Sequence, residues 1–549
     1  MKVAYGKHIS VAGRIAEGRI CFITEKQFRK SARPAEGYEA EAARFETARK
    51  KVILQQNTLY EEALAKAGQS VAEIFASHIA ILHDETLIKS VHRQIARKKV
   101  NAINATLAAF RNLEKEMALS EDRMLSERAA DVKDVANLLL DFLQEEEGDR
   151  NGAHEKEKPL RDKGPVILAA EDLTPSEVLR LSGENVQGII LKNGSGTSHA
   201  AILLRSMNLP TMIRCEAVSR SWDGKTAILD TAQDCVYIEP DAQIRKEMRG
   251  RKISARRKEA LLSGLKDLPS ETKSGRKIRI LANIETPREA ATALQNGAEG
   301  IGLLRTEFLF LNRDTYPDEE EQYRAYKAVL QAMRGKPVVI RTMDIGADKT
   351  PSYMDMEPER NPVLGLRAIR FCLTRPGLFK TQLRAILRAA AHGNAILLFP
   401  MITSLSEVKT CKKILRACER ELKKEKKKYK MPALGIMVET PAAALCAEEL
   451  AKEVSYLSIG TNDLLQYTCA VDRDNSRLDA FTNEAHPALR RLMQMTVDAG
   501  HRNHCTVSIC GEIGADISFT EDFLKMGVDE ISVHPAAVLP LRSAVRALD

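Results

Sequence analysis

Eight short apolar runs typical of β-strands occur between residues 278 and 535, and helical patterns separate them. In chain order they read IRILANIE, GIGLLRTE, PVVIRTMDI, AILLFPMI, ALGIMVET, YLSIGTND, TVSICGE and EISVHP. Eight strands that alternate with helices over this length are the signature of a (β/α)8 TIM barrel. We therefore predict a barrel over residues 266–549, with its chemistry at the carboxyl ends of the strands.

The preceding part of the chain combines strand patterns with a long helical insert. Residues 1–22 and 165–239 hold short apolar runs between glycine or polar turns. From about residue 35 to 143 glycine is rare, and apolar residues recur at intervals of three and four residues, as in a bundle of amphipathic helices. The expected fold class is α/β multidomain, with four parts: an α/β domain of residues 1–22 and 146–240, a helical domain of residues 23–145, a linker helix of residues 241–265 and the barrel.

Composition excludes several other classes of protein. Hydrophobic residues make up 44% and charged residues 29%, as in soluble globular proteins, and no run of eighteen apolar residues predicts membrane insertion. The N-terminus MKVAYGKHIS lacks the apolar stretch of a secretory signal. Ten cysteines without a CxxC pair indicate free thiols in a cytoplasmic protein. The net charge of +8 lies largely in two solvated runs with few aromatics nearby, so we expect no nucleic-acid partner.

The strand ends of the barrel carry groups suited to a small anionic substrate. Glu439 and Asp463 end two neighbouring runs, and two adjacent carboxylates suit Mg²⁺, although each can instead pair with a basic side chain. Arg305 and Arg341 end the second and third runs, and their planar guanidinium groups match phosphate and carboxylate. Arg367 and Arg473 can add positive charge, but an exposed loop arginine explains either residue as well.

Two further residues are candidates for the chemistry itself. Cys510 ends the seventh run, where a thiol can be an inert apolar residue, a proton donor or a nucleophile. His199 lies in NGSGTSHAAILL, near the start of a predicted helix that favours an anion such as a phosphate on the imidazole. Thr197 can bond the other ring nitrogen and fix the tautomer. The alternative is a histidine that only caps the helix or packs in the core, because Ser or Thr before a helix is usually just a cap.

These motifs, taken together, resemble those of enzyme I of the bacterial phosphotransferase system. GTSHAAI, LLRTEFLF, RTMDIGADK, NPVLGLRAIR, GIMVETPAA, SIGTNDLLQYTCAVDR and SICGE occur in that family's order, and the likeness spans nearly the whole chain. The resemblance implies an enzyme that moves the phosphoryl group of phosphoenolpyruvate to its own histidine and then to the phosphocarrier protein HPr. It also implies that the α/β domain carries this phosphohistidine, that the helical domain docks HPr and that the barrel forms a homodimer.

The resemblance also implies a role for each candidate residue. His199 matches the phosphorylated histidine, and Cys510 matches the acid that protonates the pyruvate enolate. Glu439 and Asp463 match the Mg²⁺ ligands. The residues that match contacts to phosphoenolpyruvate or other active-site positions are Arg305, Arg341, Arg367, Asn462, Asp463 and Arg473.

Three departures from the family pattern leave these groups in place. Ser195 stands in the glycine-rich approach to His199, Ala347 replaces a glycine in IGADK, and Asp230-Thr231-Ala232-Gln233-Asp234 replaces a glycine-containing turn. A pyruvate phosphate dikinase or phosphoenolpyruvate synthase is the nearest alternative, but no glycine-rich phosphate loop precedes His199. A non-catalytic regulatory relative is the other alternative, and the retained candidate residues oppose it.

Overall fold

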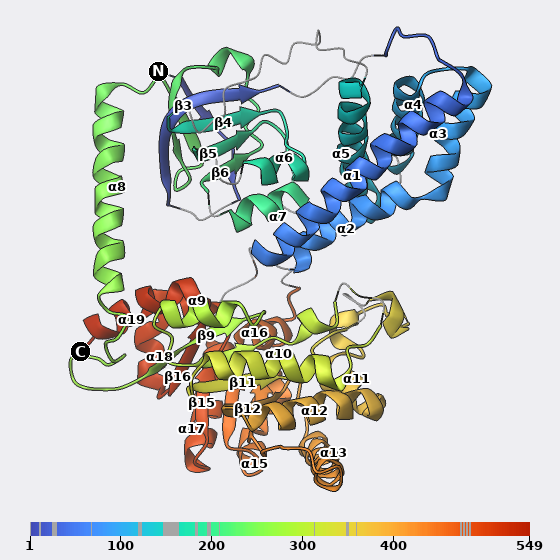
Figure 1. The fold of residues 1–549 in the computed structure, drawn as a ribbon. Coiled ribbons are helices and arrows are strands. Elements are labelled where there is room, and N and C mark those ends of the chain that lie inside the picture. The colour runs from blue at the N-terminus through green and yellow to red at the C-terminus, as the bar shows by residue number, and fades with distance from the viewer. Residues whose placement is uncertain are drawn as a thin grey trace. The chain divides into compact units, whose positions relative to one another are not determined.

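The computed structural model describes residues 2–9, 13–24, 30–66, 69–118, 123–146, 164–181, 185–194, 199–207, 209–311, 313, 315–346, 351–357, 359–472, 475, 478, 481 and 485–549. The chain divides into two compact units, Met1–Ala255 and Arg256–Asp549. The long charged helix α8 (Ala242–Ser263) runs across the division. Each unit has a sheet of its own (Figure 1).

One mixed eight-stranded sheet organises the first unit. The strands are β1 (Lys2–Tyr5), β2 (Lys7–His8), β3 (Ile15–Ile23), β4 (Val166–Ala170), β5 (Val186–Leu191), β6 (Thr211–Ile213), β7 (Thr226–Asp230) and β8 (Cys235–Ile238), in the order β1-β8-β7-β3-β4-β5-β6-β2. Both faces of β4 are buried, because Leu168 packs under α6 (Pro175–Arg180) and α7 (His199–Ser206) while Ile167 packs toward Trp222. The sheet therefore supplies a core on each side.

A five-helix bundle is inserted between two neighbouring strands of that sheet. β3 pairs with β4 in parallel, up to Ile23 opposite Ala170, and the whole bundle lies between them in sequence. Asp84 caps α3 by accepting a hydrogen bond from the Leu87 amide at 2.9 Å. The bundle has its own apolar core, and its helices are α1 (Tyr38–Lys66), α2 (Gln69–His83), α3 (Glu85–Lys98), α4 (Ala102–Ala118) and α5 (Arg123–Glu146).

The turn between β7 and β8 accommodates one departure from the family's glycine pattern. Asp234 adopts a left-handed backbone with φ of +50°, a conformation that aspartate tolerates better than most residues. Its carboxylate accepts hydrogen bonds from the backbone amide of His8 and faces His8 Nδ1, each at 2.7 Å. Asp230, at the end of β7, is fully buried and pairs with Arg251 at 2.5 Å. The turn thus keeps its shape without glycine.

The second unit is a closed barrel of eight parallel strands, with the helices outside it (Figure 1). All eight runs predicted from the sequence form strands, and the predicted fold class is confirmed. The strands are β9 (Arg279–Ile284), β10 (Ile301–Leu304), β11 (Pro337–Arg341), β12 (Asn394–Phe399), β13 (Ala433–Val438), β14 (Tyr456–Ile459), β15 (Thr506–Ile509) and β16 (Glu530–Val533). The α-helices are α9 (Glu289–Gln295), α10 (Glu319–Ala332), α11 (Ala368–Thr374), α12 (Pro376–Ala390), α13 (Leu405–Lys424), α14 (Pro441–Leu445), α15 (Ala447–Ala451), α16 (Thr461–Cys469), α17 (Pro487–Arg502), α18 (Thr520–Met526) and α19 (Val538–Ala547).

The barrel interior differs between its two sides. On β10 to β13 the inward residues form an apolar cluster, namely Leu303, Val339, Leu398 and Met437. On β14, β15, β16 and β9 the corresponding side chains are largely polar, namely Ser458, Ser508, Glu530, Ser532 and Asn283. Because barrel interiors are usually filled by branched apolar residues, the polar side is unusual, and it leads to Cys510 after β15.

Candidate active site

The carboxyl ends of the barrel strands surround a cleft of about 570 Å³. It collects most of the barrel residues predicted from the sequence, namely Arg305, Arg341, Arg367, Glu439, Asn462, Asp463 and Cys510. It also includes acidic residues that the sequence analysis did not single out for the site, namely Glu307, Asp344 and Glu512. The cleft is therefore a polar pocket with both signs of charge at the expected end of the barrel.

The arginines are held by carboxylates rather than left free. Arg341 pairs with Glu307 and with Asp344, each at 3.1 Å, and Asp344 also accepts three hydrogen bonds from Arg367 at 3.0, 3.1 and 3.3 Å. Burial lowers the pKa of Arg341, but the attraction of Glu307, Asp344 and Glu439 outweighs it and raises the pKa above its ordinary value. Arg305 pairs with Glu285 at 2.6 Å in a more exposed position. These contacts fix guanidinium forks that can bind a phosphate or carboxylate.

Glu439 and Asp463 form a pair of buried carboxylates with incomplete hydrogen bonding. Glu439 follows β13 and accepts a hydrogen bond from the Met401 amide at 2.5 Å. Burial, with repulsion from Asp463 and Asp344, raises the pKa of Glu439 to about 8. Asp463 lies in the first turn of α16, and its buried Oδ1 has no hydrogen-bond partner among the residues that the structure describes, although Arg367 Nη1 approaches it to 3.6 Å.

This donor set fits a divalent cation. Two buried carboxylates repel each other, and a cation between them would relieve both the repulsion and the unsatisfied oxygen. Within the described residues no group of three or more His, Cys, Asp or Glu side chains could hold a metal ion. Mg²⁺ is the ion that fits two carboxylates, because it usually completes its shell with water and substrate oxygens.

Cys510 is a buried thiol with a defined hydrogen-bond environment. The hydroxyl of Ser458 donates to Cys510 Sγ at 3.1 Å, and the thiol lies 3.5 Å from the carbonyl oxygen of Ile459. Burial raises the pKa of Cys510 to about 11, so the group is a thiol at neutral pH. Of the possibilities that the sequence left open, this environment favours a proton donor over a thiolate nucleophile.

Asn462 is oriented by a reciprocal contact across the cleft. Its side-chain amide donates to Glu512 Oε1 at 3.3 Å, and the Glu512 amide donates to Asn462 Oδ1 at 3.0 Å. Gly511 permits this approach, because a Cβ there would lie 1.7 Å from Thr461 Oγ1. The side chain is thus preset to contact a ligand in the cleft.

Comparisons with known proteins agree with this geometry. A family model described as "PEP-utilising enzyme, PEP-binding domain" matches residues 259–549, and the models of the N-terminal and mobile domains of PEP-utilising enzymes match residues 7–128 and 163–234. The phosphoenolpyruvate-protein phosphotransferase of Haemophilus influenzae is 41% identical over 517 residues, which cover 92% of this chain and 87% of the relative. The chain belongs to this phosphotransferase family. The resemblance predicted from the sequence is therefore confirmed.

Other members of the family are similar over comparable lengths. The Bacillus subtilis phosphoenolpyruvate-protein phosphotransferase is 38% identical over 515 residues, covering 93% of this chain and 88% of the relative. The protein of the same name from Listeria innocua is 36% identical over 548 residues, covering 99% and 94%. The shared length includes both units of the fold, so the likeness is not confined to the barrel.

Sequence reasoning missed three residues that organise the phosphotransferase cleft. Asp344 bridges Arg341 and Arg367, Glu307 pairs with Arg341, and Ser458 contacts Cys510. Glu307 and Asp344 follow β10 and β11 within three residues, so the rule that strand ends carry chemistry could have found both. Ser458 lies within β14 and not at its end, so that rule does not find it. Only the inward direction of its side chain marks it as part of the site.

Three residues predicted for the site cannot be placed in it. Thr197 and Arg473 lie outside the described residues. His199 is the first residue of α7, as the sequence predicts, but its side chain is not among those described. The roles of these three residues remain predictions.

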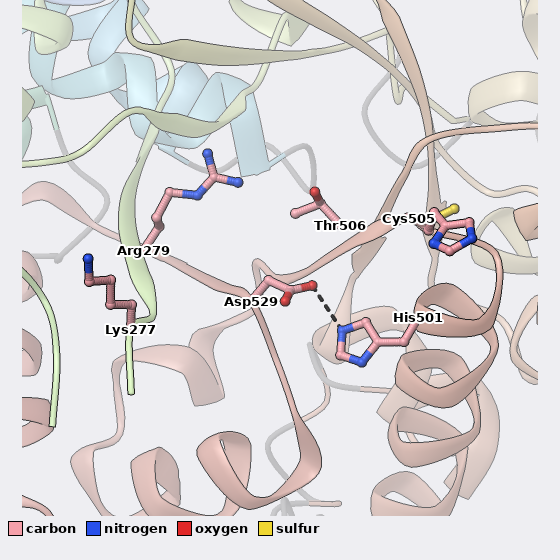
Figure 2. A pocket seen from close by; sticks show the side chains of 7 residues that line it. Lys277, Arg279, His501, Cys505, Thr506 and Asp529 are labelled. Carbon is pink, nitrogen blue, oxygen red and sulfur yellow. Dashed lines mark hydrogen bonds and ion pairs between the residues drawn. The ribbon is translucent and has the colours of Figure 1, made fainter. Parts of the chain in front are cut away.

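A second cleft lies at the amino ends of the barrel strands. Arg279 begins β9 and Thr506 begins β15, and both line this cleft together with Lys277, His501, His504, Cys505 and Asp529 (Figure 2). Figure 2 shows His501 turned toward Asp529, with Nε2 3.1 Å from Oδ2. Because the chemistry of such barrels occurs at the opposite ends of the strands, we assign no reaction to this cleft.

In the part of the chain that the structure describes, no helix is both long enough and apolar enough to cross a bilayer.

Proposed function

We propose that this chain transfers the phosphoryl group of phosphoenolpyruvate to its own His199, releases pyruvate, and then passes the phosphoryl group to the phosphocarrier protein HPr. This is the first step of the phosphotransferase system that drives sugar uptake, and we assign it to the cytoplasm. Membership of the phosphoenolpyruvate-protein phosphotransferase family supports the reaction. The single structural observation that carries the proposal is the cleft in which fixed arginines, two buried carboxylates and a protonated thiol converge.

Each candidate residue has a role in this reaction. Arg305, Arg341 and Arg367 bind the phosphate and carboxylate of phosphoenolpyruvate, with Asn462 and Arg473 completing the contacts. Glu439 and Asp463 hold Mg²⁺, which when bound neutralises charge on the substrate phosphate. Once the phosphoryl group has left, Cys510 gives its proton to C3 of the pyruvate enolate. Thr197 fixes the ring tautomer of His199 for attack on phosphorus.

We assign the steps of the reaction to the domains predicted from the sequence. We assign His199 to the α/β domain of residues 1–22 and 146–240, HPr docking to residues 23–145, and the link to residues 241–265. We assign phosphoenolpyruvate binding and homodimer formation to residues 266–549. The barrel and the bundle each have an apolar cluster of their own, which supports this division, while a further cluster joins the sheet to α1 and α2 of the bundle.

Labelling with phosphoenolpyruvate tests the central proposal. Incubation with Mg²⁺ and substrate labelled at phosphorus is expected to give an acid-labile, base-stable phosphoprotein, because that stability is typical of phosphohistidine. Replacement of His199 by alanine is expected to abolish the label while leaving substrate binding intact, because the cleft is built by other residues. Labelling of the alanine variant would contradict the assignment, and phosphorylation that required ATP and pyruvate would favour a dikinase.

The affinity for Mg²⁺ is expected to rise with pH. Because the raised pKa of Glu439, about 8, keeps much of this carboxyl protonated at neutral pH, Mg²⁺ must displace its proton in order to bind. The dissociation constant should fall by up to about tenfold per pH unit below pH 8 and level off above it. Calorimetry in buffers of different ionisation enthalpy measures both the affinity and the protons released. Equal affinity at pH 6.5 and 8.5, without proton release, would contradict Glu439 as a ligand.

A further inference from the structure

The polar side of the barrel interior lies against the thiol of Cys510. On β14, Leu457 and Ile459 belong to the core shared with the outer helices, so Tyr456 and Ser458 face the interior. On β15, Val507 and Ile509 belong to the same outer core, which turns Ser508 inward. Ser458 is therefore an interior hydroxyl beside Cys510, on the neighbouring strand.

The contact between Ser458 and Cys510 is fixed by the backbone. Ile459 pairs in register with Ile509, and the Cys510 amide donates to the Ile459 carbonyl at 3.1 Å. Ser458 has no exposed surface, and its Oγ lies 3.1 Å from Cys510 Sγ. The carbonyl of Ile459, 3.5 Å from the sulfur, can only accept a hydrogen bond. When the thiol proton points at that carbonyl, the Ser458 hydroxyl must be the donor to sulfur.

We propose that Ser458 is a positioning residue for proton transfer from Cys510: its hydroxyl holds the sulfur in place and stabilises the thiolate that remains after the proton has moved to pyruvate enolate. The inference rests on the proposed role of Cys510. In that step the S–H bond breaks and a C3–H bond forms from the electron pair of the enolate double bond, while C2–O becomes a carbonyl. The sulfur keeps the S–H pair and its negative charge until water returns a proton, and the Ser458 proton stays on its oxygen.

Charged groups on the surrounding strands also shift the balance between thiol and thiolate at Cys510, but they do so without a hydrogen bond to the sulfur. Glu439, after β13, favours the thiol, whereas Arg341 on β11 and Arg305 after β10 favour the thiolate. Tyr456 begins β14, two residues before Ser458, and its hydroxyl donates a hydrogen bond to Glu530 at 2.6 Å. Among the described residues, Ser458 is the group that donates directly to the sulfur. Since a hydrogen bond to an ionised group is stronger than one to its neutral form, removing this hydroxyl weakens Cys510 as an acid.

Exchange of the pyruvate methyl protons with solvent isolates this step. In D₂O with Mg²⁺ the full-length enzyme is expected to exchange these protons, because transfer between sulfur and C3 is reversible, and NMR follows the loss of the methyl signal. Ser458→Ala should slow exchange at saturating pyruvate roughly 10- to 100-fold, the range for a hydrogen bond to a charged group. The pyruvate concentration for half-maximal rate should not change. Ser458→Thr retains the hydroxyl and should restore most of the rate.

Ser508 provides a matched control. It pairs in register with Ser458 on the neighbouring strand, is equally buried and also faces the interior. Ser508→Ala removes the same atom from the same layer and should leave exchange near the wild-type rate.

Each outcome of these exchange measurements either supports or overturns the positioning role of Ser458. Slow exchange in Ser458→Ala, with rescue by threonine and normal exchange in Ser508→Ala, supports it. Normal exchange in Ser458→Ala while Cys510→Ala is inactive overturns the role of Ser458 and leaves that of Cys510. Normal exchange in Cys510→Ala overturns both. Equal slowing in the two serine variants, or a change confined to the half-maximal pyruvate concentration, also overturns the positioning role.

Discussion

Replacement of Glu439 by glutamine is expected to lower the rate of phosphoryl transfer from phosphoenolpyruvate about 1000-fold, the scale of the several kcal/mol that a metal supplies to a transition state. Glutamine keeps the size of the side chain and can still accept the hydrogen bond from the Met401 amide. It removes the charge that Mg²⁺ needs. Single-turnover labelling of the protein measures the rate, and calorimetry measures Mg²⁺ binding.

Glu530 offers a matched control for this substitution. It is also a buried carboxyl of the barrel whose pKa is raised by burial, but it begins β16 at the opposite end and contacts Tyr456 and Arg279. Glu530→Gln is therefore expected to keep the rate of phosphoryl transfer within a few-fold of the parent enzyme, because a residue that does not touch the substrate affects this rate only indirectly. If Glu439→Gln retained near-normal rate and Mg²⁺ affinity, or if Glu530→Gln lost the rate equally, the cleft carboxylates would not be the metal ligands.

The barrel and the position of its cleft follow from sequence periodicity and one topological rule. Each strand is a short apolar run between helical patterns, and the rule places function where the strands end. Glu439 and Cys510 could be identified in this way, since each directly follows a strand. Arg367 could not, because it precedes α11 and reaches the cleft only through the fold. The resemblance to enzyme I supplied its role.

The interactions that tune the site lie beyond what a sequence pattern can give. Asp344 is shared by Arg341 and Arg367, and that sharing depends on side-chain directions across elements far apart in the chain. Ser458 and Ser508 look alike in sequence, and only the three-dimensional register shows which hydroxyl donates to Cys510. Strand patterns specify which face is buried, but not which neighbour a polar atom meets.

Cutting the chain within α8 is expected to separate the two half-reactions completely. The apolar clusters of the sheet and the bundle contain no residue beyond Ile238, and those of the barrel begin at Ile278, so each part has its own core. Fragments of residues 1–245 and 255–549 should therefore each fold. Trp222, the one tryptophan of the chain, is buried in the first fragment and reports its folding by fluorescence. Circular dichroism serves for the second.

Each fragment should then retain one half-reaction and lack the other. Under the proposed function His199 would have to meet the barrel cleft during turnover and HPr afterwards, because phosphoryl transfer requires donor and acceptor in contact, and we therefore expect a domain movement. The fragment of residues 1–245 is expected to exchange phosphate with phosphorylated HPr but to gain no label from phosphoenolpyruvate. The fragment of residues 255–549 is expected to bind Mg²⁺ and phosphoenolpyruvate and to exchange pyruvate methyl protons, yet to form no phosphohistidine. Direct labelling of the first fragment by phosphoenolpyruvate would mean that substrate binds outside the barrel, because that fragment contains none of the cleft residues.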